Sequence, residues 1–174
     1  ASSSSFPPNG WVETTLGEVC EIFDCPHSTP NWTQSGYFVV RNYNLVDGRI
    51  DESKKSYTDQ VNYEQRIKRA VPKKGDIILS REAPIGAVGM VINAEDLCLG
   101  QRVVLIKPHS IHNKYLLYKL LSPSVQNEFK ISENTGSVVS NLRIPLIKNL
   151  AFTIPPLPEQ QAIASVLSAF DDKI

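Results

Sequence analysis

Long hydrophobic runs are absent from this sequence of 174 residues, and no stretch approaches the length needed to cross a membrane. The opening residues, ASSSSFPPNG, contain neither the basic nor the apolar segment of a secretory signal, so we expect a flexible tail over residues 1–10. Cysteine is scarce and odd in number, with Cys20, Cys25 and Cys98, which favours a reducing compartment. These absences predict a cytoplasmic chain without a membrane contact.

Metal ligation is the alternative interpretation of Cys20, Cys25 and His27. No second pair of ligands follows at the spacing of a zinc site, so buried or half-exposed thiols are favoured. Internal repeats are also absent. A chain of 174 residues with 41% apolar and 21% charged residues is typical of one globular domain with an appendage.

The formal net charge is zero, which by itself gives no support to the binding of a polyanion. The charges are nevertheless unevenly distributed. Residues 41–81 carry ten Lys and Arg against six acidic residues, and residues 101–150 carry seven against two. Residues 1–40 carry four acidic residues and no Lys or Arg. Folding that gathers the two basic segments on one face would create a local positive field, and the alternative is a set of solvated surface charges.

The apolar pattern predicts an α+β fold with a strongly twisted sheet or partial β-barrel and several short helices. Thr15 and Glu18 match a capping box, which predicts a short helix over 16–22. The run YFVVRNYNL reads as a strand, and VDGRID as a tight turn. Further strands are expected over 76–81, 87–92, 102–107 and in LAFTIP, and further helices around 62–69, 115–121, 145–149 and from 123 onward.

The closing segment IPPLPEQQAIASVLSAFDDKI predicts a helix. Pro158 suits a first helical turn, and Glu159 favours the positive end of the helix dipole. Apolar residues recur along one side at three- and four-residue steps: Ile163, Val166, Leu167, Phe170 and Ile174. No Gly or Asn follows as a cap, so either the chain was cut here or another polypeptide meets this stripe. The alternative is a helix that packs on its own domain.

A family likeness rests on five segments in a fixed order: GWVETTLGEVCEI, KKGDIILSREAPIGAVGMV, CLGQRVVLIKP, TGSVVSNLRIPLIKNLAFTIPPLPEQ and IPPLPEQQAIASVLSAFDDKI. Together they resemble the specificity subunits of type I restriction–modification systems. In that family a proline-rich link and a Glu-Gln pair lead from a target recognition domain into a long coiled-coil helix. The likeness spans about residues 10–174.

The resemblance implies a subunit with two recognition domains, each reading one half of a split double-stranded DNA site, and two long helices that set the gap. Methyltransferase subunits that bind S-adenosylmethionine dock on this scaffold, and restriction subunits complete the cleaving complex. The specificity subunit catalyses nothing and binds no cofactor. Here the resemblance implies a recognition domain over 11–156 and the start of a coiled-coil spacer helix over 157–174, in a bacterial or archaeal cytoplasm. The chain is then a fragment or half-subunit, whose helix meets a second recognition domain or a second copy.

DNA recognition requires cationic or amide donors for phosphates and flat polar side chains for base edges. Candidate base contacts follow strands or precede turns: Arg41, Asn42, Asn44, Arg81, Glu82, Gln101 and Arg102. Asn44 has an alternative role in the turn, and Glu82 has one as the ion-pair partner that orients Arg81. For Gln101 and Arg102 the alternative is a contact within the sheet.

Candidate phosphate contacts lie in a Gly-containing loop and in a lysine-rich segment: Ser137, Ser140, Asn141, Arg143, Lys68 and Arg69. The alternative for the loop is a set of internal hydrogen bonds. Among the aromatic residues, Tyr43 is the candidate for stacking on a base, whereas Trp32 and Tyr37 are expected in the core.

Two other classes of function remain open from the sequence. Asp76 and Glu82, with nearby lysines, are compatible with a metal-dependent nuclease, although no lysine follows Glu82 at a short spacing. A β-rich module that binds a carbohydrate or another non-nucleic-acid ligand would show no salt-dependent DNA affinity. The target bases and the oligomeric state do not follow from the sequence.

Overall fold

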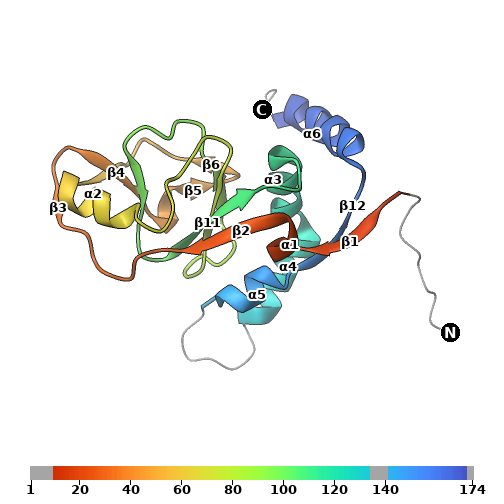
Figure 1. Cartoon of the computed structure of the whole chain (residues 1–174), viewed down its shortest axis with the longest axis horizontal. Coiled ribbons are helices and arrows are strands. Elements are labelled where there is room, and N and C mark those ends of the chain that lie inside the picture. The colour runs from red at the N-terminus through yellow and green to blue at the C-terminus, as the bar shows by residue number, and fades with distance from the viewer. Residues whose placement is uncertain (1–9, 134–140, 172–174) are drawn as a thin grey trace.

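The computed structural model describes residues 10–133 and 141–171, so the candidates Ser137, Ser140 and Ile174 lie outside the described residues. A four-stranded antiparallel sheet occupies the middle of the molecule (Figure 1). Its strands, in spatial order, are β2 (Cys20–Asp24), β11 (Val103–Pro108), β8 (Ile77–Ser80) and β9 (Val88–Met90). No helix of the described chain is both long and apolar enough to cross a membrane.

A second four-stranded sheet packs on one face of the central sheet. It contains β10 (Leu97–Leu99), β4 (Tyr37–Val40), β7 (Ser56–Thr58) and β3 (Trp32–Thr33). The pair β10–β4 is parallel, and the other pairs are antiparallel. The helix α2 (Gln60–Arg66) lies at this end of the molecule (Figure 1).

The other face of the central sheet is covered by helices and by a two-stranded antiparallel ribbon. The helices are α1 (Leu16–Val19), α3 (Asn113–Leu121), α4 (Pro123–Glu133), α5 (Ile144–Lys148) and α6 (Leu157–Asp171), and the ribbon pairs β1 (Val12–Thr15) with β12 (Ala151–Ile154). The molecule thus has three layers, with the central sheet between the second sheet and the helices. The fold is α+β as predicted, and its sheets do not close into a barrel.

The central sheet separates two hydrophobic cores. Ile77 and Leu79 point into the core that is shared with the helices, whereas Ile78 between them points into the core shared with the second sheet. On β11 the residues 103–106 alternate in the same way, and all four have no exposed surface. A strand that is buried on both faces needs apolar residues at successive positions, which explains the unbroken runs IIL and VVLI.

The predicted elements are largely present, with two corrections near the start of the chain. The helix predicted over 16–22 ends at Val19, and Cys20–Asp24 is the strand β2. Thr15 makes no side-chain cap, and it is the Thr14 hydroxyl that donates to Glu18. Burial on the central sheet outweighs the short-range capping pattern at this point.

The tight turn predicted in VDGRID is confirmed. It joins β5 (Leu45–Val46) to β6 (Arg49–Ile50), and Asp47 and Gly48 both adopt the left-handed conformation, with φ of 51° and 84°. Two consecutive positive φ values define the turn that matches the twist of a short hairpin. The helix expected around 62–69 begins earlier, because the Asp59 side chain accepts the Asn62 N–H and caps α2.

The three cysteines are buried, which confirms the thiol interpretation. Burial raises the pKa of Cys20 and of Cys98 to about 12, and it also raises the pKa of Cys25. No group of metal-binding side chains is found among residues 10–133 and 141–171.

We expect the native protein to resist thiol reagents. Burial disfavours the reactive thiolate form and blocks access of the reagent, so reaction with DTNB at pH 8 should be at least about 100-fold slower than in guanidinium chloride. Absorbance at the wavelength of the released thiolate measures both rates. Fast reaction of even one thiol in the folded protein would contradict its burial.

Candidate nucleic-acid interface

Five segments that are distant in sequence meet beside the end of the central sheet. We call this region the junction and define it by residues 24–29, 40–44, 80–84, 100–102 and 141–143. Backbone hydrogen bonds join its segments. The Arg81 N–H donates to the Arg102 carbonyl at 2.9 Å, and the Leu142 N–H donates to the Arg81 carbonyl at 2.9 Å. The Gly100 N–H donates to the Val40 carbonyl at 2.7 Å. The junction contains most of the residues that the sequence singled out.

Arg81 links three of these segments through its side chain. Its Nε donates to the carbonyl of Leu142 at 2.8 Å, and its Nη1 donates to Asp24 Oδ1 at 2.8 Å. The side chain is only 12% exposed. Arg81 is therefore a scaffold residue, and the alternative that pairs it with Glu82 is wrong because Asp24 is its carboxylate partner.

The three candidate amides are also engaged inside the protein. Asn44 has no exposed surface, its Oδ1 accepts the Arg41 N–H, and its Nδ2 donates to the carbonyls of Asp51 and Lys54. Asn42 donates to the carbonyl of Ala83, and Gln101 donates to the carbonyl of His27. An amide needs both its NH₂ and its oxygen to read adenine. Asn44 thus takes the structural alternative, and Asn42 and Gln101 would have to break these bonds to read an adenine with both amide groups.

The exposed cations of the junction are Arg41, Arg102 and Arg143. The guanidinium of Arg41 lies against two aromatic rings, 4.8 Å from the centroid of Trp32 and 4.9 Å from that of Tyr43. Arg102 is 60% exposed and pairs loosely with Glu82, with 3.5 Å between Nε and Oε2. The ion-pair partner of Glu82 is therefore Arg102, the cation that faces solvent, and it is not Arg81.

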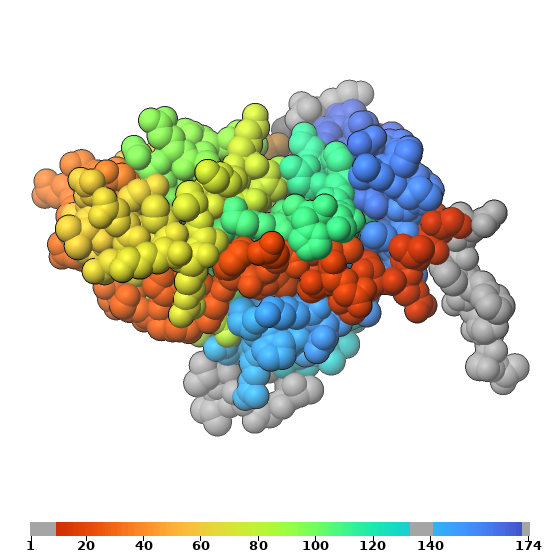
Figure 2. Space-filling view, in the orientation of Figure 1, coloured from red at the N-terminus to blue at the C-terminus, as the bar shows by residue number. Residues whose placement is uncertain are grey.

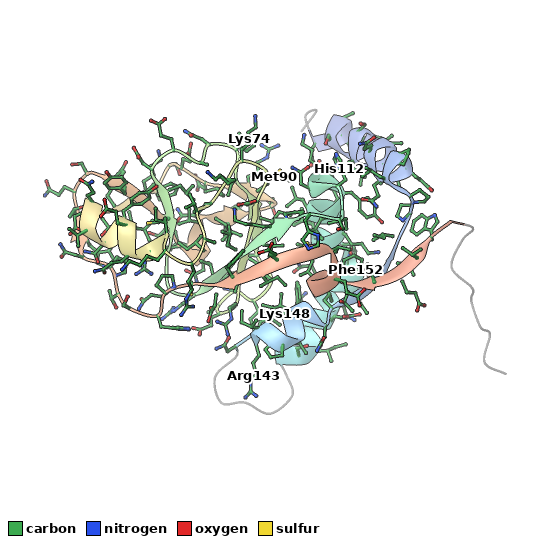
Figure 3. All side chains as sticks on the ribbon, viewed as in Figure 1. Lys74, Met90, His112, Arg143, Lys148 and Phe152 are labelled. Carbon is green, nitrogen blue, oxygen red and sulfur yellow. The ribbon has the colours of Figure 1, made fainter. Side chains whose placement is uncertain are left out.

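Asn141 and Arg143 are exposed on the segment that leads into α5. Arg143 extends outward at the lower edge of the molecule in Figure 3, and Lys148 of α5 lies above it. Lys74 lies on the opposite side in the same view, so it does not share a surface with Arg143 (Figure 3). Lys68 and Arg69 are exposed and follow α2, and their side chains make no hydrogen bond or ion pair with the junction among the residues that the structure describes.

Two residues that contact the junction from outside it were not singled out by the sequence as candidates. Trp32 was expected in the core but is 42% exposed, because β3 is an edge strand of only two residues. Arg66 was counted among the surface charges but is buried, and its guanidinium donates to the carbonyls of Leu99, Ser28 and Pro26. Burial lowers the pKa of Arg66. A basic residue at the end of a short helix carries no sequence signal for such a role.

The residues of the nuclease alternative do not converge. Asp76 precedes β8 and Glu82 follows it, so the strand separates the two carboxylates. Asp76 accepts from the Lys107 ammonium and from the Lys73 N–H, whereas Glu82 faces Arg102. This arrangement provides no shared metal site.

Helix α6 docks on α3 through a side that the sequence did not predict. Gln160 is 3% exposed, its Oε1 accepts the His112 N–H at 2.9 Å, and its Nε2 donates to the Pro155 carbonyl at 2.8 Å. Near the other end of α6, the Tyr118 hydroxyl donates to Asp171 at 2.8 Å. The two helices are in direct contact in the space-filling view (Figure 2).

The apolar stripe predicted for the closing helix is divided between two environments. Ile163 packs against the core, whereas Val166 and Phe170 are 58% and 64% exposed and Leu167 is 39% exposed. The helix therefore packs on its own domain and still presents apolar side chains to solvent. The alternative of a helix that packs on its own domain is therefore confirmed for this part of α6, and a partner polypeptide for the exposed side chains stays a prediction.

Comparison with known proteins shows which family has this architecture. Residues 8–174 match the family described as the type I restriction modification DNA specificity domain. The chain is 29% identical over 174 residues to a putative type I restriction enzyme MjaX specificity subunit of Methanocaldococcus jannaschii, covering 96% of this chain and 41% of that protein. It is 35% identical over 135 residues to the MjaIX specificity subunit of the same organism, covering 78% of this chain and 30% of that protein.

Solved structures show the same fold. The HsdS subunit from Thermoanaerobacter tengcongensis matches with a TM-score of 0.65 and 22% identity, covering 99% of this chain and 40% of that one. A chain from a type I restriction–modification system, solved in work on complex assembly and conformational transition, gives a TM-score of 0.70 and 22% identity, covering 99% of this chain and 41% of that one.

This chain belongs to the type I restriction–modification DNA specificity family. The family assignment confirms the resemblance predicted from the five sequence segments. The chain spans about two fifths of the length of the MjaX relative that it matches.

Proposed function

We propose that this chain reads one half of a bipartite double-stranded DNA site for a type I restriction–modification complex, without catalysing a reaction itself. The recognition domain comprises residues 11–156, and α6 begins the spacer helix. Methyltransferase subunits, which supply the S-adenosylmethionine, dock on this scaffold, and restriction subunits join the full complex in the cytoplasm of the cell. This chain binds no cofactor in the proposed role.

The proposal rests above all on the two different roles that polar side chains have within the junction. Arg81, Asn42 and Gln101 use their donors to tie the loops together, whereas Arg41, Arg102 and Arg143 keep their guanidinium groups toward solvent. A rigid loop cluster that presents several arginines suits DNA recognition, because fixed cations can be matched to phosphates and guanines. Asn141 lies beside Arg143 and extends the same surface.

The exposed apolar side chains of α6 suit a protein partner. Val166, Leu167 and Phe170 follow one another at helical spacing on the side that α3 leaves uncovered. Such a stripe matches the seam of a coiled coil, so we propose that a second recognition domain or a second copy supplies the facing helix. The family supports this arrangement, since its members are specificity subunits.

Binding of duplex DNA should depend strongly on salt. If the chain neutralises two or three phosphates, its association constant should fall by at least about tenfold between 50 and 200 mM NaCl, because condensed counterions are released on binding. Fluorescence anisotropy with a labelled duplex that was selected from a random pool measures this slope.

The control for the salt measurement is Lys74→Ala, on the opposite side of the molecule from Arg143. This variant should keep the parental dependence of the association constant on salt. Arg143→Ala should make that dependence less steep by the contribution of about one phosphate contact. Binding that is independent of salt, or absent with every duplex, would refute the proposed function and favour the non-nucleic-acid alternative.

A further inference from the structure

Arg41 is held in an unusual way for an exposed arginine. Its guanidinium lies over the rings of both Trp32 and Tyr43, which are 42% and 43% exposed. The Tyr43 hydroxyl is itself fixed by a 2.8 Å hydrogen bond with the Ser56 hydroxyl. The three side chains come from β3 and from the turn after β4, so the arrangement exists only in the folded protein.

The backbone beneath Arg41 is equally constrained. The Arg41 N–H donates at 2.9 Å to the side chain of Asn44, which is fully buried. Gly100 packs directly on this turn, and a Cβ at Gly100 would lie 2.8 Å from the Val40 carbonyl oxygen and 3.5 Å from Arg41 Cγ. The backbone conformation at Arg41 therefore depends on glycine at position 100, and the arginine side chain begins from a backbone that is held in place.

Most donors of the Arg41 side chain have no acceptor within the residues that the structure describes. Arg66 and Arg81 donate to backbone carbonyls or to a carboxylate at 2.7–2.8 Å. Within the described part of the chain, the one hydrogen bond of the Arg41 side chain is a 3.5 Å contact from Nη1 to the Tyr43 hydroxyl. The aromatic rings thus restrict the guanidinium by stacking while leaving the N–H groups at its edge available.

We propose that Arg41 reads the O6 and N7 atoms of a guanine in the major groove, with Trp32 and Tyr43 as positioning residues. This inference rests on the proposed function. Two parallel N–H groups of a planar guanidinium match two adjacent acceptors, and among the four bases only guanine presents that pair in the major groove. Stacking restricts the side chain before DNA arrives, so less conformational freedom is lost on binding.

The test begins with selection from a random pool of duplex DNA, using the full chain. The parent should enrich one motif, and Arg41→Ala should lose the preference for one guanine in it while other positions stay unchanged. The loss should be about 10- to 100-fold in affinity for that duplex. Arg41→Lys keeps the charge but not the paired donors, so it should lose nearly the same preference.

The contact itself is isolated with 7-deazaguanine, which lacks the N7 acceptor. At the chosen position this base should weaken binding of the parent at least about fivefold and leave Arg41→Ala unaffected, because the two changes remove the same interaction. Trp32→Ala should weaken the same preference about three- to tenfold and affect no other base pair. The matched control is Arg49→Ala, an exposed arginine on β6 without an aromatic platform, which should behave like the parent.

The outcomes separate this inference from the proposed function. A parent that enriches no motif would refute both. A motif that Arg41→Ala and Arg41→Lys leave intact would refute the guanine contact alone. Equal weakening on all duplexes, with full rescue by lysine, would identify Arg41 as a phosphate contact and overturn the inference. If Trp32→Ala weakened binding equally on all duplexes, the ring would not position Arg41 for one base. The same conclusion would follow if this variant had a lower melting temperature and partial unfolding accounted for its loss of binding.

Discussion

Replacing Arg81 by alanine is expected to lower the free energy of unfolding by about 3 kcal/mol. The substitution leaves the Asp24 carboxylate and the Leu142 carbonyl without their 2.8 Å donors. Because the arginine side chain is 12% and the aspartate 25% exposed, water recovers part of the loss, and the value lies below that of a fully buried pair. Urea unfolding followed by circular dichroism measures the change.

Arg102→Ala provides the matched control for Arg81. Arg102 is 60% exposed and only 3.5 Å from its carboxylate partner, so its removal should change stability by less than about 0.5 kcal/mol. Its effect should instead be found in DNA affinity. Equal stability losses for the two variants would show that Arg81 does not hold the junction together.

Replacing Gln160 by leucine is expected to cost about 2–4 kcal/mol. The leucine has a similar size, but it leaves the His112 N–H and the Pro155 carbonyl without the amide that joins them. Gln160 is 3% exposed, so water does not readily replace these bonds. Thermal and urea unfolding of the variant give the loss directly.

Gln161→Leu is the control for this substitution. Gln161 is the exposed neighbour on the same helix, and the same chemical change there should alter stability by less than about 0.5 kcal/mol. A neutral Gln160→Leu would mean that the bonds of Gln160 contribute nothing to holding α6 on α3.

The sequence predicted the order of the elements well because most of them have strong local signals. The strand β8, the turn at Asp47-Gly48 and the helix α6 were expected from apolar runs, turn residues and helical spacing. The strands β3, β7 and β10 were missed because they have only two or three residues each. Such strands are stabilised by neighbours that come from other parts of the chain, and a local pattern does not contain that information.

The sequence predicted which residues belong to the candidate site, but it did not predict which of them face solvent and which hold the loops together. Arg41 and Arg81 both follow an apolar strand, yet one is stacked at the surface and the other is bonded inside the junction. The difference arises from Trp32 in one case and from Asp24 and Leu142 in the other, which are distant in sequence. Amide residues behave similarly, since the full burial of Asn44 depends on the loop that folds over it.

The anchoring of α6 by Gln160 at one end and by Asp171 at the other makes the helix a rigid arm with a fixed starting angle. Along such an arm each added residue advances the chain by about 1.5 Å and turns it by about 100°. A segment that continued α6 as a helix would be set in both distance and rotation by the number of residues between it and Gln160. Adding or deleting four residues within the exposed part of such an arm would shift its far end by about 6 Å with only about 40° of rotation, whereas a change of two would turn it to the opposite side.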